Sequence, residues 1–225
     1  MTTDLPLDVE TALRAEMVLC GRLLYERGLV VAGDGNLSAR LPDDTILITP
    51  AGLAKGMLTV DDLLVIDLDG RLVRGAPGRQ PSSERYLHLF VYRHRPDIMA
   101  CIHAHPPTAV GATLAGVSLA EPLLPEALIA LGPIPTAPYA LTGTTEMGAA
   151  IEPFVADHEA ILLAYHGAVT YGTTLLQAFH RMEQIEHCAR TLLAAHLFGG
   201  ARPLPPERLA ELQEVRRAFR AAGRI

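Results

Sequence analysis

Two histidines placed two residues apart are the first candidates for chemistry in this chain. His103 and His105 stand in CIHAHPP, at the end of the apolar run 98–102, which predicts a buried strand. Side chains at positions i and i+2 of a strand point to the same face, so the two imidazoles should project together. Pro106 and Pro107 cannot donate ladder hydrogen bonds and should end the strand. The arrangement suits a metal ion, although paired histidines are also common as ordinary surface or hydrogen-bonded residues.

A third histidine and one carboxylate could complete a metal site. His166 lies at the end of a second buried strand, predicted over 160–164, and sheets often carry their sites at strand ends. Glu84 begins a helix predicted over 84–93. Three imidazoles and a carboxylate are typical of catalytic Zn²⁺ sites, which leave room for a substrate oxygen. Because separation in sequence does not show that these groups meet, a metal site and a set of unrelated polar residues both stay open on the motifs alone.

The remaining histidines have no such context. They lie on predicted helices or at their ends, where imidazoles are most often solvated or packed. We expect this ordinary role for His88, His94, His158, His180, His187 and His196.

Three short segments are rich in groups that can bind an anion. They are AGDGNLS at 32–38, ITPAG at 48–52 and PSSE at 81–84. Each one alone is typical of a tight turn or a helix cap, and Ser82 and Ser83 are candidate N-cap residues. Together they offer backbone N–H groups and hydroxyls that suit a phosphate or carboxylate. The sequence therefore predicts an anion pocket that has no cluster of arginines.

Composition limits the class of protein. The chain has 225 residues, 49% of them hydrophobic, which favours one large domain over residues 1–225. A net charge of −6 without a basic run argues against a nucleic-acid partner, and no apolar stretch reaches membrane-spanning length. The start, MTTDLPLDVE, lacks the features of a signal peptide. The three widely spaced cysteines form no disulfide framework, so free thiols in a reducing cytoplasm are expected.

Helices and strands alternate along the chain and must position these residues. A 3.6-residue period, capping residues and prolines predict helices over 8–27, 84–93, 108–115, 145–157 and 174–197 and in the tail 203–224. Apolar runs predict strands over 45–49, 98–102 and 160–164, with a hairpin over 63–73. This mixture predicts an α/β fold with a mixed sheet covered on both faces.

The five ordered motifs GDGNLS, ITPAG, PSSE, HAH and YHG resemble the class II aldolase/adducin family, above all its fuculose-phosphate aldolase branch, over residues 10–200. The resemblance implies a three-layer α/β/α fold around a mostly antiparallel sheet. It also implies a cyclic homotetramer with active sites between subunits. By position, His103, His105 and His166 resemble the zinc ligands, and Glu84 resembles the residue that approaches the metal and acts as acid and base. Substrate and phosphate contacts fall by position on Gly35, Asn36, Ala51, Gly52, Ser82 and Ser83.

This chain also departs from the fuculose-phosphate aldolase pattern. Threonines expected near Gly33 and Ala51 are absent, and Pro125 or Glu126 stands where a tyrosine is expected. A further tyrosine near the C-terminus has no counterpart in FRAAGRI. By this resemblance, all of the metal ligands and part of the anion pocket are retained in this chain. We expect the part of the substrate that becomes the aldehyde to differ from that of fuculose phosphate.

These observations predict a cytoplasmic, zinc-dependent aldolase, with Mn²⁺ or Co²⁺ as possible substitutes for zinc. Its substrate would be a small 1-phosphoketose of the fuculose-1-phosphate or 5-deoxy-pentulose phosphate type, cleaved to dihydroxyacetone phosphate and an aldehyde. Lys55, the only lysine, is expected to pair with substrate charge near the anion pocket, and Glu126 is a second candidate for proton transfer. Three alternatives stay open: a decarboxylase, epimerase or dehydratase with the same enediolate chemistry; a non-catalytic, adducin-like binding protein; and a purely structural zinc site.

Overall fold

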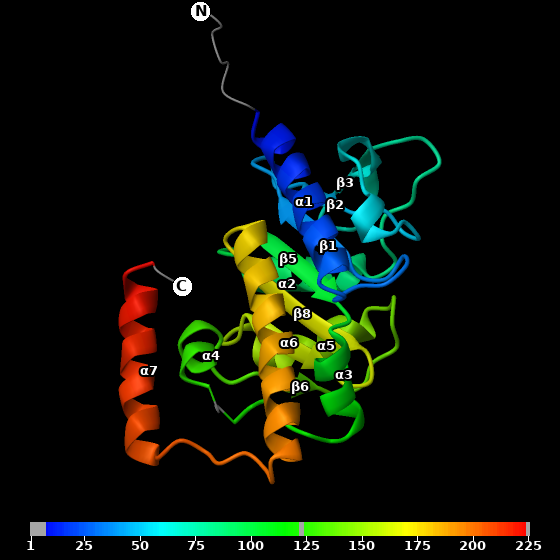
Figure 1. Ribbon diagram of the computed structural model, residues 1–225. Helices are drawn as coiled ribbons and strands as arrows, with labels where there is room; N and C mark the ends of the chain where they lie inside the picture. The colour runs from blue at the N-terminus through cyan, green and yellow to red at the C-terminus, as the bar shows by residue number, and fades with distance from the viewer. Residues whose placement is uncertain (1–7, 122–123, 224–225) are drawn as a thin grey trace, which may run out of the picture.

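The computed structural model describes residues 8–121 and 124–223 and arranges them around an eight-stranded sheet (Figure 1). The strand order is β4-β3-β2-β1-β5-β8-β7-β6. Neighbouring strands are antiparallel throughout, except that β6 and β7 are parallel. The predicted mixed, mostly antiparallel sheet is therefore confirmed. The strands are β1 (Asn36–Arg40), β2 (Ile46–Ile48), β3 (Leu64–Ile66), β4 (Leu72–Arg74), β5 (Ala100–Ala104), β6 (Thr136–Ala137), β7 (Ala160–Leu163) and β8 (Gly167–Gly172).

Helices cover both faces of this sheet, as a three-layer α/β/α fold requires. In Figure 1, α1, α3 and α6 lie on the near face, and their apolar side chains form one core cluster with the sheet. A second cluster joins α2 and α5 to the opposite face. The helices are α1 (Val9–Glu26), α2 (Arg85–His94), α3 (Pro107–Leu114), α4 (Pro125–Ala130), α5 (Glu146–Val155), α6 (Leu175–Leu197) and α7 (Pro206–Ala221), with short 3₁₀ helices η1 (Lys55–Met57) and η2 (Val60–Asp62).

The two-residue period of β5 decides which way its histidine points. Ala100, Ile102 and Ala104 belong to the core cluster under α1 and α6, whereas Cys101 belongs to the cluster under α2 and α5. His103 follows Cys101 by two residues and so faces the α2 side of the sheet. The first turn of α2, where Glu84 stands, lies on that same side.

The predicted helices agree with the structure to within two residues at most ends, and the predicted strands are all present. His103 lies inside β5, which extends to Ala104, and Pro107 begins α3. The structure adds β1, β6, β8 and α4, which the sequence pattern did not predict. β1 has polar residues at alternate positions, and β8 has a glycine at each end. Neither segment therefore shows the apolar run that predicts a buried strand. The prediction about a signal segment falls largely on residues 1–7, which lie outside the described residues.

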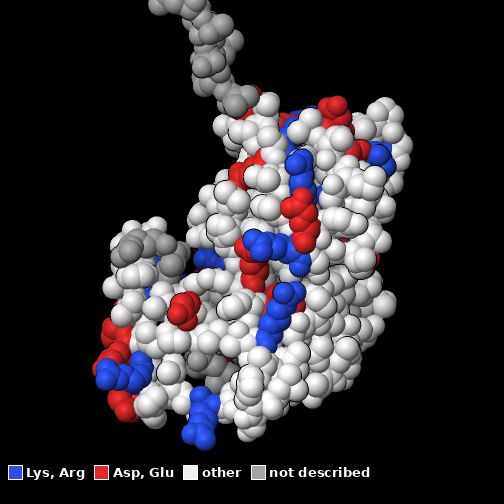
Figure 2. All heavy atoms as spheres, in the orientation of Figure 1, with Lys and Arg blue, Asp and Glu red and all other residues white. Residues whose placement is uncertain are grey.

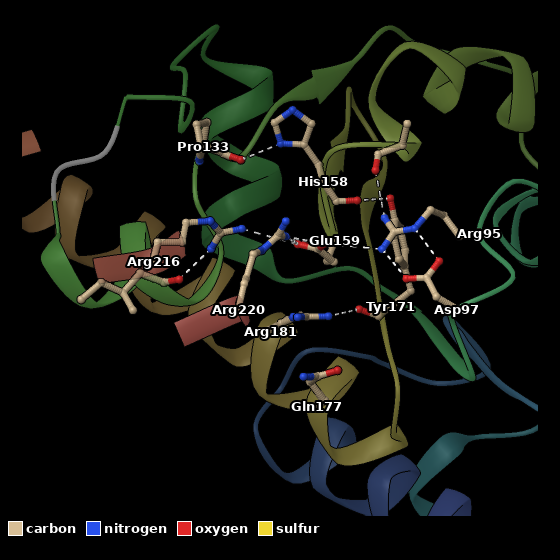
Figure 3. Close-up of polar contacts among 12 residues, drawn as sticks. Arg95, Asp97, Pro133, His158, Glu159, Tyr171, Gln177, Arg181, Arg216 and Arg220 are labelled. Atoms are coloured by element: carbon tan, nitrogen blue, oxygen red, sulfur yellow. Dashed lines mark hydrogen bonds and ion pairs between the residues drawn. The ribbon is translucent and has the colours of Figure 1, made fainter. Parts of the chain in front are cut away.

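The last helix is held to the rest of the molecule by arginines around one buried carboxylate (Figure 3). Glu159 at the start of β7 forms ion pairs with Arg220 and, at 3.5 Å, Arg216, both on α7. Arg95 approaches the same carboxylate at 3.6 Å. Arg216 also donates to the carbonyl of Ile129 at the end of α4, at 2.7 Å. These contacts attach α7, seen apart from α6 in Figure 1, to α4 and the sheet edge.

Acidic and basic side chains are mixed on the face shown in Figure 2, where red and blue groups lie side by side along the molecule. Arg27 at the end of α1 pairs with Glu183 on α6 at 3.1 Å, and Arg190 pairs with Glu186 at 2.8 Å. Within residues 8–121 and 124–223, no helix combines the length and apolar character that crossing a membrane requires. Cys20 and Cys101 are buried free thiols, and Cys188 is a half-buried one.

Candidate metal centre

Three strands and one helix bring the predicted metal ligands together. β5 pairs with β1 on one side and β8 on the other, so that His103 stands opposite Asn36 and Val169. His105 follows β5 directly, and His166 lies in the turn between β7 and β8. Glu84 occupies the N-cap position of α2. Residues far apart in the sequence thus meet at one end of the central strands.

The turn that carries His166 is tightly constrained. Tyr165 has a φ of +62°, a left-handed conformation that costs energy for a non-glycine residue and is often found at functional sites. Its N–H donates to Thr113 Oγ1 at 3.1 Å. A Cβ on Gly167 would lie 2.4 Å from the carbonyl oxygen of Ala104, so only glycine fits after the histidine. The YHG motif therefore fixes the direction of His166 against the end of β5.

Four donor groups meet in the described part of the chain. One ligand atom each from Glu84, His103, His105 and His166 lies within 4.8 Å of the others. Glu84 Oε2 is 3.2 Å from His103 Nε2, and Glu84 Oε1 is 3.2 Å from His166 Nε2. His105 Nε2 lies 3.0 Å from His103 Nε2. This compact set contains three imidazole nitrogens and one carboxylate.

The surrounding groups leave these donor atoms free to bind a cation. His103 Nδ1 donates to the carbonyl of Ala168 at 2.9 Å, so its Nε2 is the ring nitrogen that faces the cluster. Glu84 Oε1 is buried without a hydrogen-bond partner among the described residues. Asp34 Oδ2 lies 3.6 Å from His105 Nδ1, on the side away from the cluster. A divalent metal ion that takes nitrogen and oxygen ligands would bind the Glu84 carboxylate oxygen together with the neighbouring imidazole nitrogens. The residues present therefore fit such an ion.

Electrostatics favour the charge states that a cation site needs. Burial alone would raise the pKa of Glu84, but the adjacent His103 and His166 outweigh burial and hold that pKa well below its usual range. Burial, followed by the nearby His103 and His166, lowers the pKa of His105 to about 4. Glu84 is therefore ionised and His105 is neutral near pH 7, as metal ligation requires.

A cavity of about 140 Å³ opens beside the candidate metal cluster of Glu84, His103, His105 and His166 and is formed by the predicted anion-binding segments. The bridge between Pro50 and Pro81 and the bond from Ser82 N to Thr49 O, at 3.3 Å, draw two of these segments together. All six predicted contact residues line the cavity, and none of the lining side chains is Lys or Arg. The lining residues are Gly33, Asp34, Gly35, Asn36, Pro50, Ala51, Gly52, Ser82, Ser83, Glu84 and His105.

Asn36 connects the cavity to the metal cluster. Its Nδ2 donates to Glu84 Oε2 at 3.1 Å, while its Oδ1 is buried without a partner in the described structure. Gly35 has a φ of +71°, and a Cβ there would lie 2.9 Å from the carbonyl oxygen of His103. The glycine before Asn36 therefore lets the loop approach β5 closely enough for the amide to reach Glu84.

One predicted role is wrong in this structure. Ser82 and Ser83 do not supply a side-chain cap to α2, because Glu84 occupies the N-cap position and Ser82 Oγ accepts only from Glu84 N, at 3.3 Å. Lys55 is 1% exposed and does not line the cavity, so its predicted pairing with substrate charge would act through the loops and stays a prediction. Glu126 is exposed on α4 and lines no part of this cavity within the chain.

Sequence reasoning did not single out two residues of this region. Asp34, in the middle of the glycine-rich AGDGN, lines the cavity beside His105. His88 is fully buried one turn after Glu84, and its Nδ1 lies 2.6 Å from Ser38 Oγ. The four-residue spacing from Glu84 on a predicted helix is a signal that could have placed His88 near the site.

Comparisons with known proteins find relatives of this chain in both sequence and fold. Residues 15–193 match the class II aldolase and adducin N-terminal domain family. The 3-oxo-tetronate 4-phosphate decarboxylase of Haemophilus influenzae is 36% identical over 178 residues, covering 77% of this chain and 83% of the relative. The 5-deoxy-D-ribulose 1-phosphate aldolase of Bacillus thuringiensis is 31% identical and covers 93% and 96%. The crystal structure of YgbL from Escherichia coli has a TM-score of 0.84 at 31% identity, covering 92% of this chain and all of that one.

Proposed function

Since the chain belongs to the class II aldolase and adducin family, we propose that it is a zinc-dependent lyase that cleaves a small 1-phosphoketose by a retro-aldol reaction. The products would be dihydroxyacetone phosphate and an aldehyde. The observation that carries this proposal is the convergence of Glu84, His103, His105 and His166 at the rim of a cavity lined with anion-binding segments. The similarity to a 5-deoxy-D-ribulose 1-phosphate aldolase over nearly the whole chain supports it.

The metal ligands would be His103, His105 and His166, with Glu84 beside them. A divalent cation bound there supplies a Lewis acid that stabilises negative charge developing on the substrate oxygens. No lysine is needed for imine chemistry, and the only lysine is buried and does not line the cavity. The remaining work of positioning the substrate and moving protons falls to the side chains and backbone of this chain.

Glu84 is the group we assign to proton transfer. Its carboxylate accepts the proton of the hydroxyl on C4 while the C3–C4 bond breaks and C4 leaves as the aldehyde. The same proton then passes from Glu84 to C3, which yields dihydroxyacetone phosphate. Asn36 donates to Glu84 Oε2 at 3.1 Å, and Oε1, which lies 3.2 Å from His166 Nε2, is the oxygen that we assign to the proton.

The cavity would bind the phosphate of the substrate. Backbone N–H groups of the two glycine-containing loops and the hydroxyls of Ser82 and Ser83 provide the donors. The positive φ of Gly35 and Gly52 shapes these loops without side chains that would fill the space. Phosphate bound here would place the adjoining carbons next to His105 and Glu84, which line the same cavity.

A decarboxylase is the second candidate, because the first relatives in the comparison are 3-oxo-tetronate 4-phosphate decarboxylases. Loss of CO₂ from such a substrate leaves the same three-carbon ketose phosphate as the retro-aldol reaction. The two reactions share the phosphate-bearing half of the substrate and differ only in the leaving group, an aldehyde or CO₂. The candidate metal site and the cavity described above would bind the phosphate-bearing half that the two substrates share.

One assay separates the two reactions. Zinc-loaded protein would be incubated with fuculose 1-phosphate, 5-deoxyribulose 1-phosphate and 3-oxo-tetronate 4-phosphate, and both dihydroxyacetone phosphate and CO₂ would be measured. We expect dihydroxyacetone phosphate without CO₂ from a 1-phosphoketose, and its loss in Glu84→Gln. Turnover of the keto acid alone, with equal amounts of CO₂ and ketose phosphate, would replace the aldolase by the decarboxylase. No turnover of any of the three would reject both.

A further inference from the structure

The only lysine of the chain lies directly behind the cavity, although it does not reach its surface. Lys55 is 1% exposed, and its ammonium contacts the backbone of both loops that form the cavity. We propose that Lys55 is a positioning residue for phosphate: it ties the two loops together and supplies the fixed positive charge that the lining lacks. The proposal rests on the proposed function in taking phosphate as the ligand of this cavity.

The contacts of Lys55 show how it joins the loops. Its Nζ donates to the carbonyl of Gly33 at 2.9 Å and to that of Leu53 at 2.7 Å. The two loops approach each other so closely that a Cβ on Gly33 would lie 3.1 Å from the carbonyl carbon of Gly52. Because one ammonium holds a carbonyl from each loop, the spacing between the loops, and with it the width of the cavity, depends on Lys55.

The backbone around Lys55 is fixed from the other side by α1. Lys55 begins η1, and a Cβ on Gly21 of α1 would lie 2.8 Å from the Lys55 carbonyl oxygen. A Cβ on Gly56 would likewise meet the ring of Tyr25 at 2.6 Å. Both glycines allow η1 to pack closely on α1. The ammonium is therefore held at one place relative to the cavity, instead of moving on a flexible side chain.

Burying the Lys55 ammonium costs free energy, which indicates that its positive charge has a function. Both contacts of Nζ are neutral carbonyls, and no ion pair of Lys55 occurs in the part of the chain that the structure describes. Burial lowers the pKa of Lys55 to about 8, and the more distant Asp34 and Glu84 act against that change. A buried charge without a contacting counter-ion favours the arrival of an anion nearby.

The charges on the cavity lining give a nearby fixed cation a role in holding an anionic ligand, in addition to the metal proposed beside Glu84. The lining includes two carboxylates, those of Asp34 and Glu84, and no lysine or arginine. A phosphate entering this space meets repulsion from both carboxylates. Backbone N–H groups and serine hydroxyls donate hydrogen bonds but carry no net charge. Lys55 donates to the carbonyls of Gly33 and Leu53 and so holds a positive charge beside both loops, and it should select phosphorylated over neutral ligands.

Variants at Lys55 test both parts of the proposal. Lys55→Met removes the charge and the hydrogen bonds, whereas Lys55→Gln removes the charge and keeps an N–H donor. Arg22→Met on the exposed face of α1 is the control for losing one positive charge. Binding of inorganic phosphate to the zinc-loaded proteins would be measured by calorimetry, together with metal content and thermal unfolding. We expect affinity for phosphate to fall at least tenfold in both Lys55 variants and to be unchanged in Arg22→Met, with metal content unaltered in all three.

Two results of this series would overturn the proposal. Wild-type affinity for phosphate in Lys55→Met would remove Lys55 from phosphate binding altogether. Wild-type affinity in Lys55→Gln alone would reject the role of charge. With a turned-over substrate, the same variants should raise KM for the phosphorylated compound while kcat and the KM of its unphosphorylated analogue change little. A purely structural role would instead lower activity toward both compounds equally.

The wild-type protein provides a test that does not depend on any variant folding. Because Lys55 is the only lysine, protein grown with isotope-labelled lysine gives one side-chain ammonium signal in the NMR spectrum. We expect inorganic phosphate to shift this signal saturably, with the dissociation constant found by calorimetry, and sodium chloride at equal ionic strength to leave it unmoved. Saturation of phosphate binding without any shift of the lysine signal would refute the proposal. Neither measurement needs turnover, so failure of the lyase assay and failure of this inference are distinguishable.

Discussion

Glu84 is the residue on which the proposed chemistry depends most. It lies between His103 and His166, at 3.2 Å from each, and receives a hydrogen bond from Asn36. Glu84→Gln keeps the shape of the side chain and removes the proton acceptor. We expect kcat to fall about 10²- to 10⁴-fold, the usual contribution of general acid and base catalysis, with KM nearly unchanged. Steady-state kinetics together with metal analysis would check this, and near-normal kcat would assign proton transfer to another group.

The histidine cluster makes a separate prediction about metal content. Purified protein should contain about one zinc ion per chain, as a single site with three imidazoles requires. His105→Ala should reduce that content to a small fraction and abolish activity, while circular dichroism stays that of a folded protein. His94→Ala, which removes an exposed histidine from α2, is the matched control and should keep the metal. Equal metal content in both variants, measured by mass spectrometry, would exclude His105 as a ligand.

At the scale of residues, the sequence predicted the convergence of Glu84, His103, His105 and His166 better than it predicted their surroundings. HAH and YHG carry a local geometry, a strand end and a tight turn, that can be seen in the residues themselves. The burial of Lys55 could not be predicted, because it depends on the packing of η1 against Gly21 and Tyr25 of α1, far away in sequence. Ser82 and Ser83 do not cap α2, because the helix begins one residue later than predicted and Glu84 takes the N-cap position.

The helix α2 contains a buried polar chain that should govern acid stability. His88, fully buried, lies 2.6 Å from Ser38 Oγ on β1, which lies 2.8 Å from Tyr92 Oη. Burial, followed by the nearby His103, lowers the pKa of His88 to about 3. His88 is therefore neutral in the folded protein down to low pH, while the unfolded chain takes up a proton below about pH 6.5.

The sign of the pH effect follows from that difference. Between about pH 6.5 and pH 3 the unfolded state binds the extra proton, so the free energy of unfolding should fall as pH decreases. The expected contribution of His88 is about 1.4 kcal/mol per pH unit over this range. Denaturant unfolding of metal-free protein at several pH values would measure it. His88→Gln should show a shallower pH dependence than the wild type, and His94→Gln should not; equal slopes would contradict the assignment.

Among the elements, amphipathic helices were predicted well and central strands less so. The long helix α6 begins within a residue of its predicted start, because Thr174 caps it with a bond to Gln177 N at 3.0 Å. β1 was missed although it pairs with β5 at the middle of the sheet. Its Asn36 and Ser38 point toward buried polar partners, so the strand lacks the apolar run that marks β5 and β7. The polar residues that reach Glu84 and His88 therefore obscured the strand that carries them.

At the scale of the whole molecule, the end of α6 exposes an apolar surface that a partner subunit could cover. Leu197 and Phe198 are 81% and 92% exposed, and a cavity of about 570 Å³ lies between α3 and α6. A homotetramer stays the prediction for the assembly. Light scattering should give a mass about four times 24.2 kDa. Phe198→Glu should shift the protein toward smaller species if this surface is buried between copies, whereas Arg208→Glu on the exposed side of α7 should not.

Because the only lysine is buried, its chemical reactivity can be used to measure local opening of the structure. A reagent that modifies amines cannot reach Lys55 while η1 is packed on α1, because the side chain is 1% exposed. The rate of modification at Lys55 thus measures how often this part of the structure opens, by the same logic as amide hydrogen exchange. No other lysine competes for the reagent. If phosphate binds in the cavity and holds the loops closed, modification of Lys55 should be slower in its presence. The ratio of the two rates gives the increase in the free energy of opening that the ligand causes.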